Sequence, residues 1–151
     1  MEILIDTNVL LDWLLDREPF VRQADQIMRC CITGMVKGHL ASHSILNIFY
    51  ITRRAFDIEK RKEILLMLCE KFNVIGLGRQ MIVESLHNEN WNDLEDGLQM
   101  SCAVTEGVDY IITRDSEGFE FSKVQALSPG AFLKMFEAET GEPAKVAPID
   151  E

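Results

Sequence analysis

The first sixteen residues, MEILIDTNVLLDWLLD, place an acidic side chain between a predicted strand and a predicted helix. Residues 1–5 are an apolar run that is too short for a helix and favours a buried β-strand. Apolar residues then recur at helical spacing, at Val9, Leu10, Trp13 and Leu14. Thr7 or Asn8 can cap that helix. Asp6 therefore follows the carboxyl end of a strand, where parallel α/β sheets collect functional groups, although a helix-capping role explains it equally well.

The rest of the chain alternates short apolar runs with helical patterns. Further strands are predicted at 38–42, 74–77, 109–113 and 124–127. Helices are predicted after Pro19, after Ser42, after Asp57, from about 79 to 86, from Asp93 to near Gly107, and from Pro129 to about 137. The helix after Ser42 has a broad apolar face made by Ile45, Leu46, Ile48, Phe49 and Ile51. This order predicts an α/β protein with a parallel sheet, whose connections are too short for a second domain.

Length and composition fit one globular domain of 151 residues, with 47% hydrophobic and 26% charged side chains. We expect the domain to span 1–138, followed by an acidic, flexible tail over 139–151. No basic segment precedes an apolar stretch at the amino terminus, and no apolar run reaches membrane-spanning length. We therefore expect a cytoplasmic protein without membrane contact. The four cysteines show no C-x-x-C spacing and are expected to be reduced thiols.

The formal net charge of −10 argues against sequence-independent binding of nucleic acid through a broad basic face. It does not exclude a metal-dependent enzyme acting on nucleic acid, because clustered carboxylates would themselves form the metal site. Positive charge is concentrated in residues 53–62, which include Arg53 and Arg54. This run could contact a phosphate backbone, although a solvated helix face is the commoner meaning of such a run.

Three acidic residues share one kind of position. Asp6 and Asp115 follow predicted strands, and Asp96 lies in the first turn of a predicted helix. If the two strands are neighbours, their ends lie within reach of one metal ion. Carboxylates forced together raise one another's pKa, so such a cluster normally needs a cation to stay ionised. Hard oxygen ligands fit Mg²⁺ or Mn²⁺, and such a site could activate a water for attack on a phosphodiester. Helix capping is the alternative role for Asp93 and Asp96.

Four motifs taken together resemble the PIN domain family. They are DTNVLLD at 6–12, S-x-x-I-L-N-I-F-Y at 42–50, D-L-E-D-G-L-Q at 93–99 and I-I-T-R-D at 111–115. Each is weak alone, but their order and spacing are fairly specific, and the resemblance covers roughly residues 1–138. It implies a Rossmann-like, three-layer α/β/α sandwich with a central, mostly parallel sheet. It also implies a metal-dependent ribonuclease that cleaves RNA, often a VapC-like toxin with a cognate antitoxin, and often a homodimer.

The resemblance also implies roles for individual residues. The family's metal-ligand acids, which are the candidate catalytic residues, are matched by Asp6, Asp96 and Asp115. Positions that hold those acids by hydrogen bonds are matched by Thr7, Asn8 and Thr113. Arg114 lies beside the last acid and could pair with a phosphate of the substrate or neutralise the acidic rim. Arg53 and Arg54 are the other candidate contacts to substrate.

One position departs from the family pattern. The second acid, usually a glutamate on the third helix, falls on Asn47. An amide still offers a neutral oxygen, but one anionic ligand is lost, and a unit-charge pair at about 4 Å is worth on the order of 4 kcal/mol at an effective dielectric near 20. We therefore expect weakened metal affinity or loss of activity. Asp93 or Glu95 could compensate, although Glu95 should point away from Asp96 on a regular helix.

Two functions from different classes remain open. The first is a Mg²⁺- or Mn²⁺-dependent endoribonuclease, based on the three aspartates at one predicted rim. The second is a degenerate PIN scaffold that binds RNA or a protein partner without cutting, based on Asn47 and the negative net charge. Phosphotransfer through an aspartyl intermediate is disfavoured, because the phosphatases that use it need an acid two residues after the nucleophile and this chain has Asn8 there.

Overall fold

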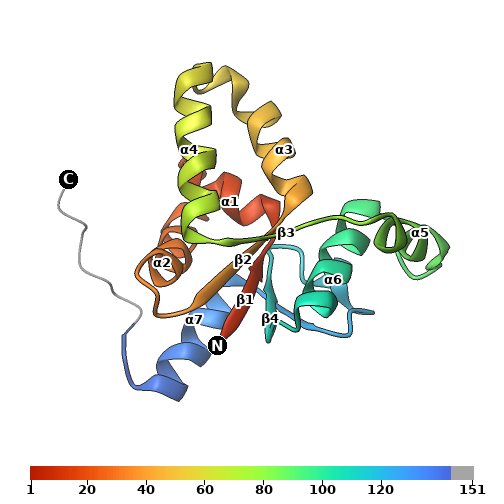
Figure 1. Ribbon diagram of the computed structural model, residues 1–151. Coiled ribbons are helices and arrows are strands. Elements are labelled where there is room, and N and C mark those ends of the chain that lie inside the picture. Colours follow the sequence, from red (N-terminus) through yellow and green to blue (C-terminus); the bar gives the residue numbers. More distant parts are fainter. Residues whose placement is uncertain (144–151) are drawn as a thin grey trace.

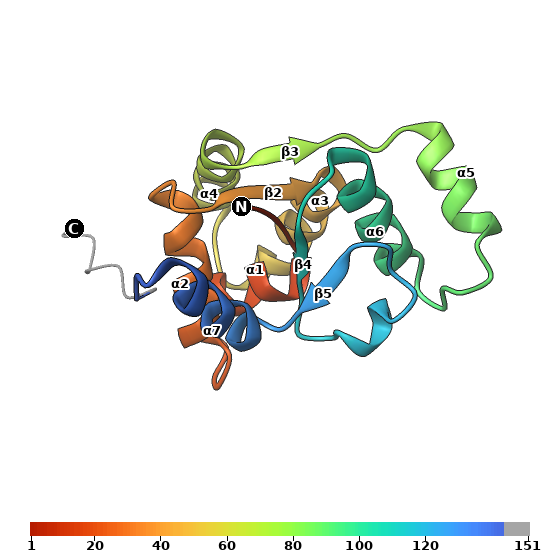
Figure 2. The same cartoon turned by 90° about the horizontal axis from the view of Figure 1, so that it is seen from below.

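Five parallel strands form one sheet in the computed structural model, which describes residues 1–143. The strands are β1 (Glu2–Ile5), β2 (Lys37–Ala41), β3 (Asn73–Ile75), β4 (Tyr110–Ile112) and β5 (Gln125–Leu127). Their order across the sheet is β3-β2-β1-β4-β5, so β1 lies at the centre (Figure 2). The predicted pairing of the strands that precede Asp6 and Asp115 is confirmed, with Leu4 opposite Ile111.

Within residues 1–143, seven α-helices cover both faces of this sheet. They are α1 (Thr7–Leu14), α2 (Val21–Ile32), α3 (Ser42–Ile51), α4 (Ile58–Lys71), α5 (Arg79–His87), α6 (Leu94–Glu106) and α7 (Pro129–Thr140), with short 3-10 helices η1 (Thr52–Arg54) and η2 (Glu117–Phe119). The first four and α7 lie on one side, and α5 and α6 on the other (Figures 1 and 2). The predicted three-layer α/β/α sandwich is therefore confirmed, with a sheet that is wholly parallel within residues 1–143.

Each face of the sheet has its own hydrophobic core. The larger core joins Ile3 and Ile5 of β1 to α1, α2, α4 and α7, and includes the fully buried Phe132. The smaller core joins Leu4 and Ile111 to α6 and η2. Alternate residues of β1 thus point to opposite cores, as the period of a strand requires. Because helices cover both faces, residues 3–5 of β1 form a continuous, fully buried apolar run.

The apolar face predicted for α3 is only partly used. Ile48 is fully buried, but Leu46 is 70% exposed and Tyr50 is 61% exposed. Both exposed residues lie on the helix that projects from the sheet beside α4, away from the two cores (Figure 1). The apolar surface of α3 is therefore wider than the part of it that the rest of the chain covers.

The last helix is longer than predicted, since residues 139 and 140 belong to α7. Residues 144–151, most of the predicted tail, lie outside the described residues. Among the described helices, none combines the length and the apolar character that crossing a membrane requires.

The contact between β2 and the end of α4 yields a stability prediction. A Cβ added at Gly38 would lie 2.5 Å from two ring carbons of Phe72, which is buried. We expect Gly38→Ala to lower the free energy of unfolding by about 1–3 kcal/mol, because the ring must move in a packed core. Urea denaturation would measure the change. Gly76→Ala is the matched control, since nothing lies within 4 Å of its added Cβ, and equal stability of the two variants would contradict the prediction.

Candidate functional site

Asp6 lies at the junction of β1, β4 and α1. Its backbone N–H continues the sheet by donating to the carbonyl of Ile112 at 2.9 Å. Its carboxylate accepts hydrogen bonds from the Thr113 hydroxyl and from the Thr7 N–H, each at 2.8 Å. The side chain is 5% exposed and also serves as the N-cap of α1. The capping interpretation of Asp6 is thus confirmed, and this residue rather than Thr7 or Asn8 provides the cap. Asp6 also lies at the carboxyl end of β1, as predicted.

Asp115 is the third residue after β4 and is held by the loop that contains η2. Its N–H donates to the Thr113 hydroxyl at 3.1 Å, and its Oδ1 accepts from the Gly118 N–H at 3.2 Å. A Cβ added at Gly118 would stand 2.9 Å from Asp115 Oδ2 and 3.1 Å from Asp96 Oδ2. Two carboxylates therefore converge on one point beside a glycine, where any larger residue would collide with them.

The amino end of α6 supplies three more acids, the N-cap Asp93 and the first-turn residues Glu95 and Asp96. Asp93 caps the helix, accepting from the Glu95 N–H at 2.9 Å, as its capping interpretation predicts. Asp96 faces the other aspartates. From regular helix spacing we predicted that Glu95 would point away from Asp96, and this prediction is wrong. The amino end of α6 faces the cavity, so both side chains reach it. The Asn47 amide of α3 donates to the Glu95 carboxylate at 3.2 Å.

These segments enclose one cavity of about 270 Å³ at the carboxyl end of the sheet. Its lining includes all three predicted metal-ligand aspartates and most of the predicted supporting residues: Asp6, Thr7, Asn8, Leu11, Arg17, Asn47, Ile51, Asp93, Glu95, Asp96 and Asp115. Thr113 is buried beneath the cavity, bonded to Asp6. Asn8 Oδ1 accepts from the Arg114 N–H at 3.4 Å, so it holds the backbone beside Asp115 instead of an acid.

Burial and mutual repulsion raise the pKa of two of these carboxyl groups. Burial raises the pKa of Asp6 to about 6, with the charges of Glu95 and Asp115 adding to it and the two hydrogen bonds opposing it. Burial also raises the pKa of Asp96 to about 7, helped by Asp6 and Asp93. None of Asp6, Asp96 and Asp115 is in an ion pair within residues 1–143. Arg17 also lines the cavity but is paired with Asp12 at 3.9 Å, so the three aspartates have no direct cationic partner within residues 1–143.

A buried polar network that the sequence did not reveal supports the floor of the cavity. The hydroxyls of Thr7 and Ser44 lie 2.7 Å apart, and the Gln99 amide donates to Ser44 at 3.0 Å and to Thr7 at 3.4 Å. All three residues are buried. The network ties α1, α3 and α6 together behind the acids. The sequence analysis named Thr7 as a supporting residue, but Ser44 and Gln99 lie in ordinary helical patterns, and nothing in the sequence shows that the three side chains meet.

The predicted cationic contacts lie outside the cavity. Arg114 is held in a two-pronged contact with the buried Asp12, at 2.5 and 3.2 Å, and its guanidinium stacks 4.1 Å from the ring centre of Phe20. Arg53 lies in η1, beyond α3, with its guanidinium over the Tyr50 ring. Arg54 shares that 3-10 helix. The arginine that does line the cavity is Arg17, which sequence reasoning missed.

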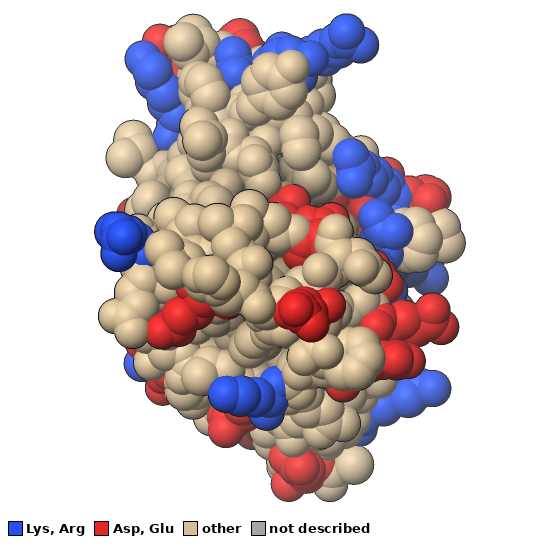
Figure 3. Space-filling view, turned by 90° about the vertical axis from the view of Figure 1, so that its right-hand side faces the viewer, with Lys and Arg blue, Asp and Glu red and all other residues tan. Residues whose placement is uncertain are grey.

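The surface around the site is mixed in charge. Figure 3 views the molecule from the side on which α5 and α6 lie, and acidic side chains form patches across the middle of that face. Lys and Arg side chains gather mainly towards its upper end, where α3, η1 and α4 meet, and towards its edges. A phosphate backbone that approached the acidic patches would therefore need a cation between the two negative surfaces.

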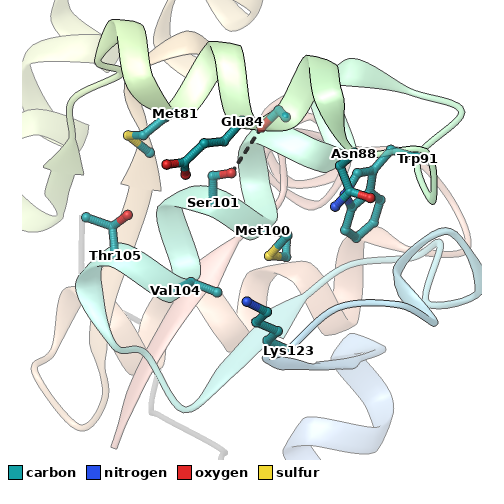
Figure 4. A pocket seen from close by; sticks show the side chains of 10 residues that line it. Met81, Glu84, Asn88, Trp91, Met100, Ser101, Val104, Thr105 and Lys123 are labelled. Carbon is teal, nitrogen blue, oxygen red and sulfur yellow. Dashed lines mark hydrogen bonds between the residues drawn. The ribbon is translucent and has the colours of Figure 1, made fainter.

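A second pocket, between α5 and α6, contains none of the predicted site residues. The hydroxyls of two lining residues, Ser85 and Ser101, lie 3.0 Å apart. The dashed line at Ser101 in Figure 4 marks this hydrogen bond. Its charged lining residues are Glu84 and Lys123, and Met81 and Met100 supply apolar surface. Glu84 is the one acidic side chain in its lining, so this pocket differs from the acidic cavity in its donor set.

The donor set of the acidic cavity fits a hard divalent cation, although the side chains do not form a complete shell. Within residues 1–143, no group of three or more His, Cys, Asp or Glu side chains stands close enough to hold an ion by itself. Carboxylates without a cation repel one another, so an open arrangement is expected. Mg²⁺ typically keeps several waters and takes only one or two carboxylates, a requirement that Asp96 and Asp115 beside Gly118 can meet.

A protein-family model described as "PIN domain" matches residues 2–117, which contain every element from β1 to β4. No curated protein matches the sequence at a significant level. The family match therefore rests on the model that covers residues 2–117.

Solved structures with the same fold include several toxin–antitoxin proteins. A toxin-antitoxin complex from Klebsiella pneumoniae matches with a TM-score of 0.63 and 20% identity, over 84% of this chain and 97% of that chain. VapBC-1 from nontypeable Haemophilus influenzae matches with a TM-score of 0.64 and 14% identity, over 86% of this chain and 99% of that chain. VapBC2 from Rickettsia felis, in a structure bound to a DNA fragment from its promoter, matches with a TM-score of 0.59 and 12% identity, over 85% of this chain and 98% of that chain. These similarities establish the fold.

The raised pKa of Asp96 predicts how stability depends on pH. A carboxyl group whose pKa is higher in the folded than in the unfolded state holds its proton more tightly when folded, so its contribution to stability falls as the pH rises, here between about pH 4 and 7. We expect Asp96→Asn to gain stability relative to the metal-free wild type, and to gain more at pH 8 than at pH 5. Urea denaturation at both values measures this, with the exposed Glu120→Gln as the control. A gain that does not depend on pH would contradict the prediction.

Proposed function

This chain belongs to the PIN domain family, and from that membership we propose that it is a metal-dependent endoribonuclease that hydrolyses phosphodiester bonds in RNA. One observation carries the proposal: three carboxylates from separate segments of the chain, Asp6, Asp96 and Asp115, line one open cavity at the carboxyl end of the sheet. Clustered carboxylates without ion-pair partners are the donor set that Mg²⁺ or Mn²⁺ uses to dock phosphates. The three aspartates are proposed as the catalytic metal ligands.

The residues around the cavity have distinct tasks in this proposal. A bound divalent ion supplies a water of lowered pKa and neutralises the charge that develops on the phosphate. Thr113 and the Thr7 N–H fix both oxygens of Asp6, so that this ligand keeps one orientation. The Gly118 N–H fixes one oxygen of Asp115 and leaves the other directed towards Asp96.

Cationic side chains at the edge of the cavity are proposed to hold the substrate. Arg17 lines the cavity, and its guanidinium lies 3.9 Å from the Asp12 carboxylate with the side chain 39% exposed, so it is the first candidate to contact a phosphate. Arg114 is committed to Asp12 but keeps about a third of its side chain exposed, at 31%, so it can add a weaker contact. Arg53 and Arg54 are exposed at the far end of α3 and suit a more distant part of an RNA strand.

The proposed partners follow from the same family. The similar structures from Klebsiella pneumoniae and Haemophilus influenzae are toxin–antitoxin assemblies, which supports a VapC-like toxin with a cognate antitoxin. A homodimer is proposed because α3 presents unburied apolar residues, Leu46 and Tyr50, one helical turn apart on the same face. A cytoplasmic location agrees with four cysteines that are free thiols, because disulfides are rare in that compartment.

Loss of a metal ligand should abolish the proposed activity. We expect purified wild-type protein to cleave RNA when Mg²⁺ or Mn²⁺ is added, to stop when EDTA removes the ion, and to lose activity by at least about 100-fold in Asp6→Asn and Asp96→Asn. Gel analysis of a panel of labelled RNAs measures cleavage, and circular dichroism confirms that each variant is folded. Glu120→Gln should cleave as the wild type does. Equal activity of Asp6→Asn and the wild type would overturn the proposal.

The second candidate function, a scaffold that binds without cutting, is supported by the amide at position 47. The same experiment separates the two. A folded protein that binds RNA or an antitoxin but cleaves no RNA with either ion would favour the scaffold, and calorimetry that detects tight Mn²⁺ binding to the acidic cavity would count against it.

The dimer proposal makes a prediction about α3. We expect Leu46→Glu to convert a dimer to a monomer, because a charge would enter the apolar surface between the copies. Analytical ultracentrifugation measures the mass in solution. Leu66→Glu is the matched control, since this residue of α4 is equally exposed, at 71% against 70%. A wild-type protein that is monomeric at high concentration would refute the dimer.

A further inference from the structure

Asn47 and Glu95 meet in the acidic cavity although they come from different helices. The Asn47 amide, on α3, donates to Glu95 Oε1, at the start of α6, over 3.2 Å. Both residues line the cavity together with Asp6, Asp96 and Asp115. The carboxylate of Glu95 therefore lies beside the position where the family resemblance places an acid on the third helix.

The two residue types depend on each other. An amide N–H₂ can donate to a carboxylate, so Asn47 orients one oxygen of Glu95 towards itself and leaves Oε2 without a hydrogen-bond partner within residues 1–143. A carboxylate at position 47 would instead repel Glu95 at this distance. An asparagine at this position therefore favours a carboxylate at position 95, whereas an acid at position 47 would repel it unless a cation lay between the two.

The backbone at the start of α6 favours an acid at position 95. The Glu95 N–H is fixed by the Asp93 carboxylate at 2.9 Å, which sets the direction in which the side chain leaves the helix. The amino end of a helix also stabilises negative charge, through the partial positive charge of its unpaired N–H groups. Glu95 is only partly buried, so its second oxygen can reach an ion in the cavity.

We propose that Glu95 supplies the fourth anionic group of the metal site and that Asn47 positions it. The inference rests on the metal-dependent function proposed above and deepens it. The acid that is missing from α3 is provided by α6, at nearly the same place in the cavity, so the site keeps four anionic groups. Asn47 acts through Glu95 and is a positioning residue, whereas Glu95 contacts the ion.

An exchange of the two groups tests this assignment. Glu95→Gln removes the charge and keeps the shape. The double variant Asn47→Asp with Glu95→Gln restores the charge on the other helix, and the new glutamine can donate to the new aspartate across the same contact. Titration calorimetry measures the dissociation constant for Mn²⁺ alone, without RNA, for the wild type, both variants, Asp96→Asn and the exposed control Glu120→Gln. Circular dichroism without metal verifies folding.

We expect Glu95→Gln to weaken Mn²⁺ binding by about 10-fold or more, and the double variant to return to within about 3-fold of the wild type. Unchanged binding in Glu95→Gln, with binding lost in Asp96→Asn, would overturn the role of Glu95 and leave the proposed function standing. A double variant as weak as Glu95→Gln would also overturn it, because restored charge should restore binding. Absence of Mn²⁺ binding in the wild type would overturn both proposals.

Discussion

The hydrogen bond from the Thr113 hydroxyl to the Asp6 carboxylate joins the ends of the two central strands, and the geometry of the cavity depends on it. Asp6 is almost fully buried, where an ionised carboxylate is costly unless it is hydrogen-bonded. The same hydroxyl accepts from the Asp115 N–H, so a single threonine sets the positions of two acids. The remaining cost appears as the raised pKa of Asp6, which a cation in the cavity would relieve.

The topology of the sheet explains why distant acids meet. From β1 the chain proceeds to β2 and β3 on one side, and later to β4 and β5 on the other. The order therefore reverses between β1 and β4, and parallel sheets open a crevice at the carboxyl ends of such strands. Asp6 and Asp115 lie at that crevice, and α6 brings Asp96 into it from the opposite layer.

Asn47 shows the difference between a position in a motif and a position in space. By motif, the change from an acid to an amide removes a charge from the site. In space, the amide holds the carboxylate of Glu95 at the edge of the same cavity. The proposed site thus retains its total charge while the contributing helix changes.

Local patterns in the sequence determined the elements and their order. The strand before Asp6, the caps at Asp57 and Asp93 and the parallel sheet followed from spacing and turn chemistry within short segments, and the structure confirms them. Only the tertiary structure decided where side chains end up. Glu95 reaches the cavity because α6 meets it end on, and Arg114 turns to Asp12, 102 residues away in sequence. Such directions depend on packing between distant segments, which no local pattern encodes.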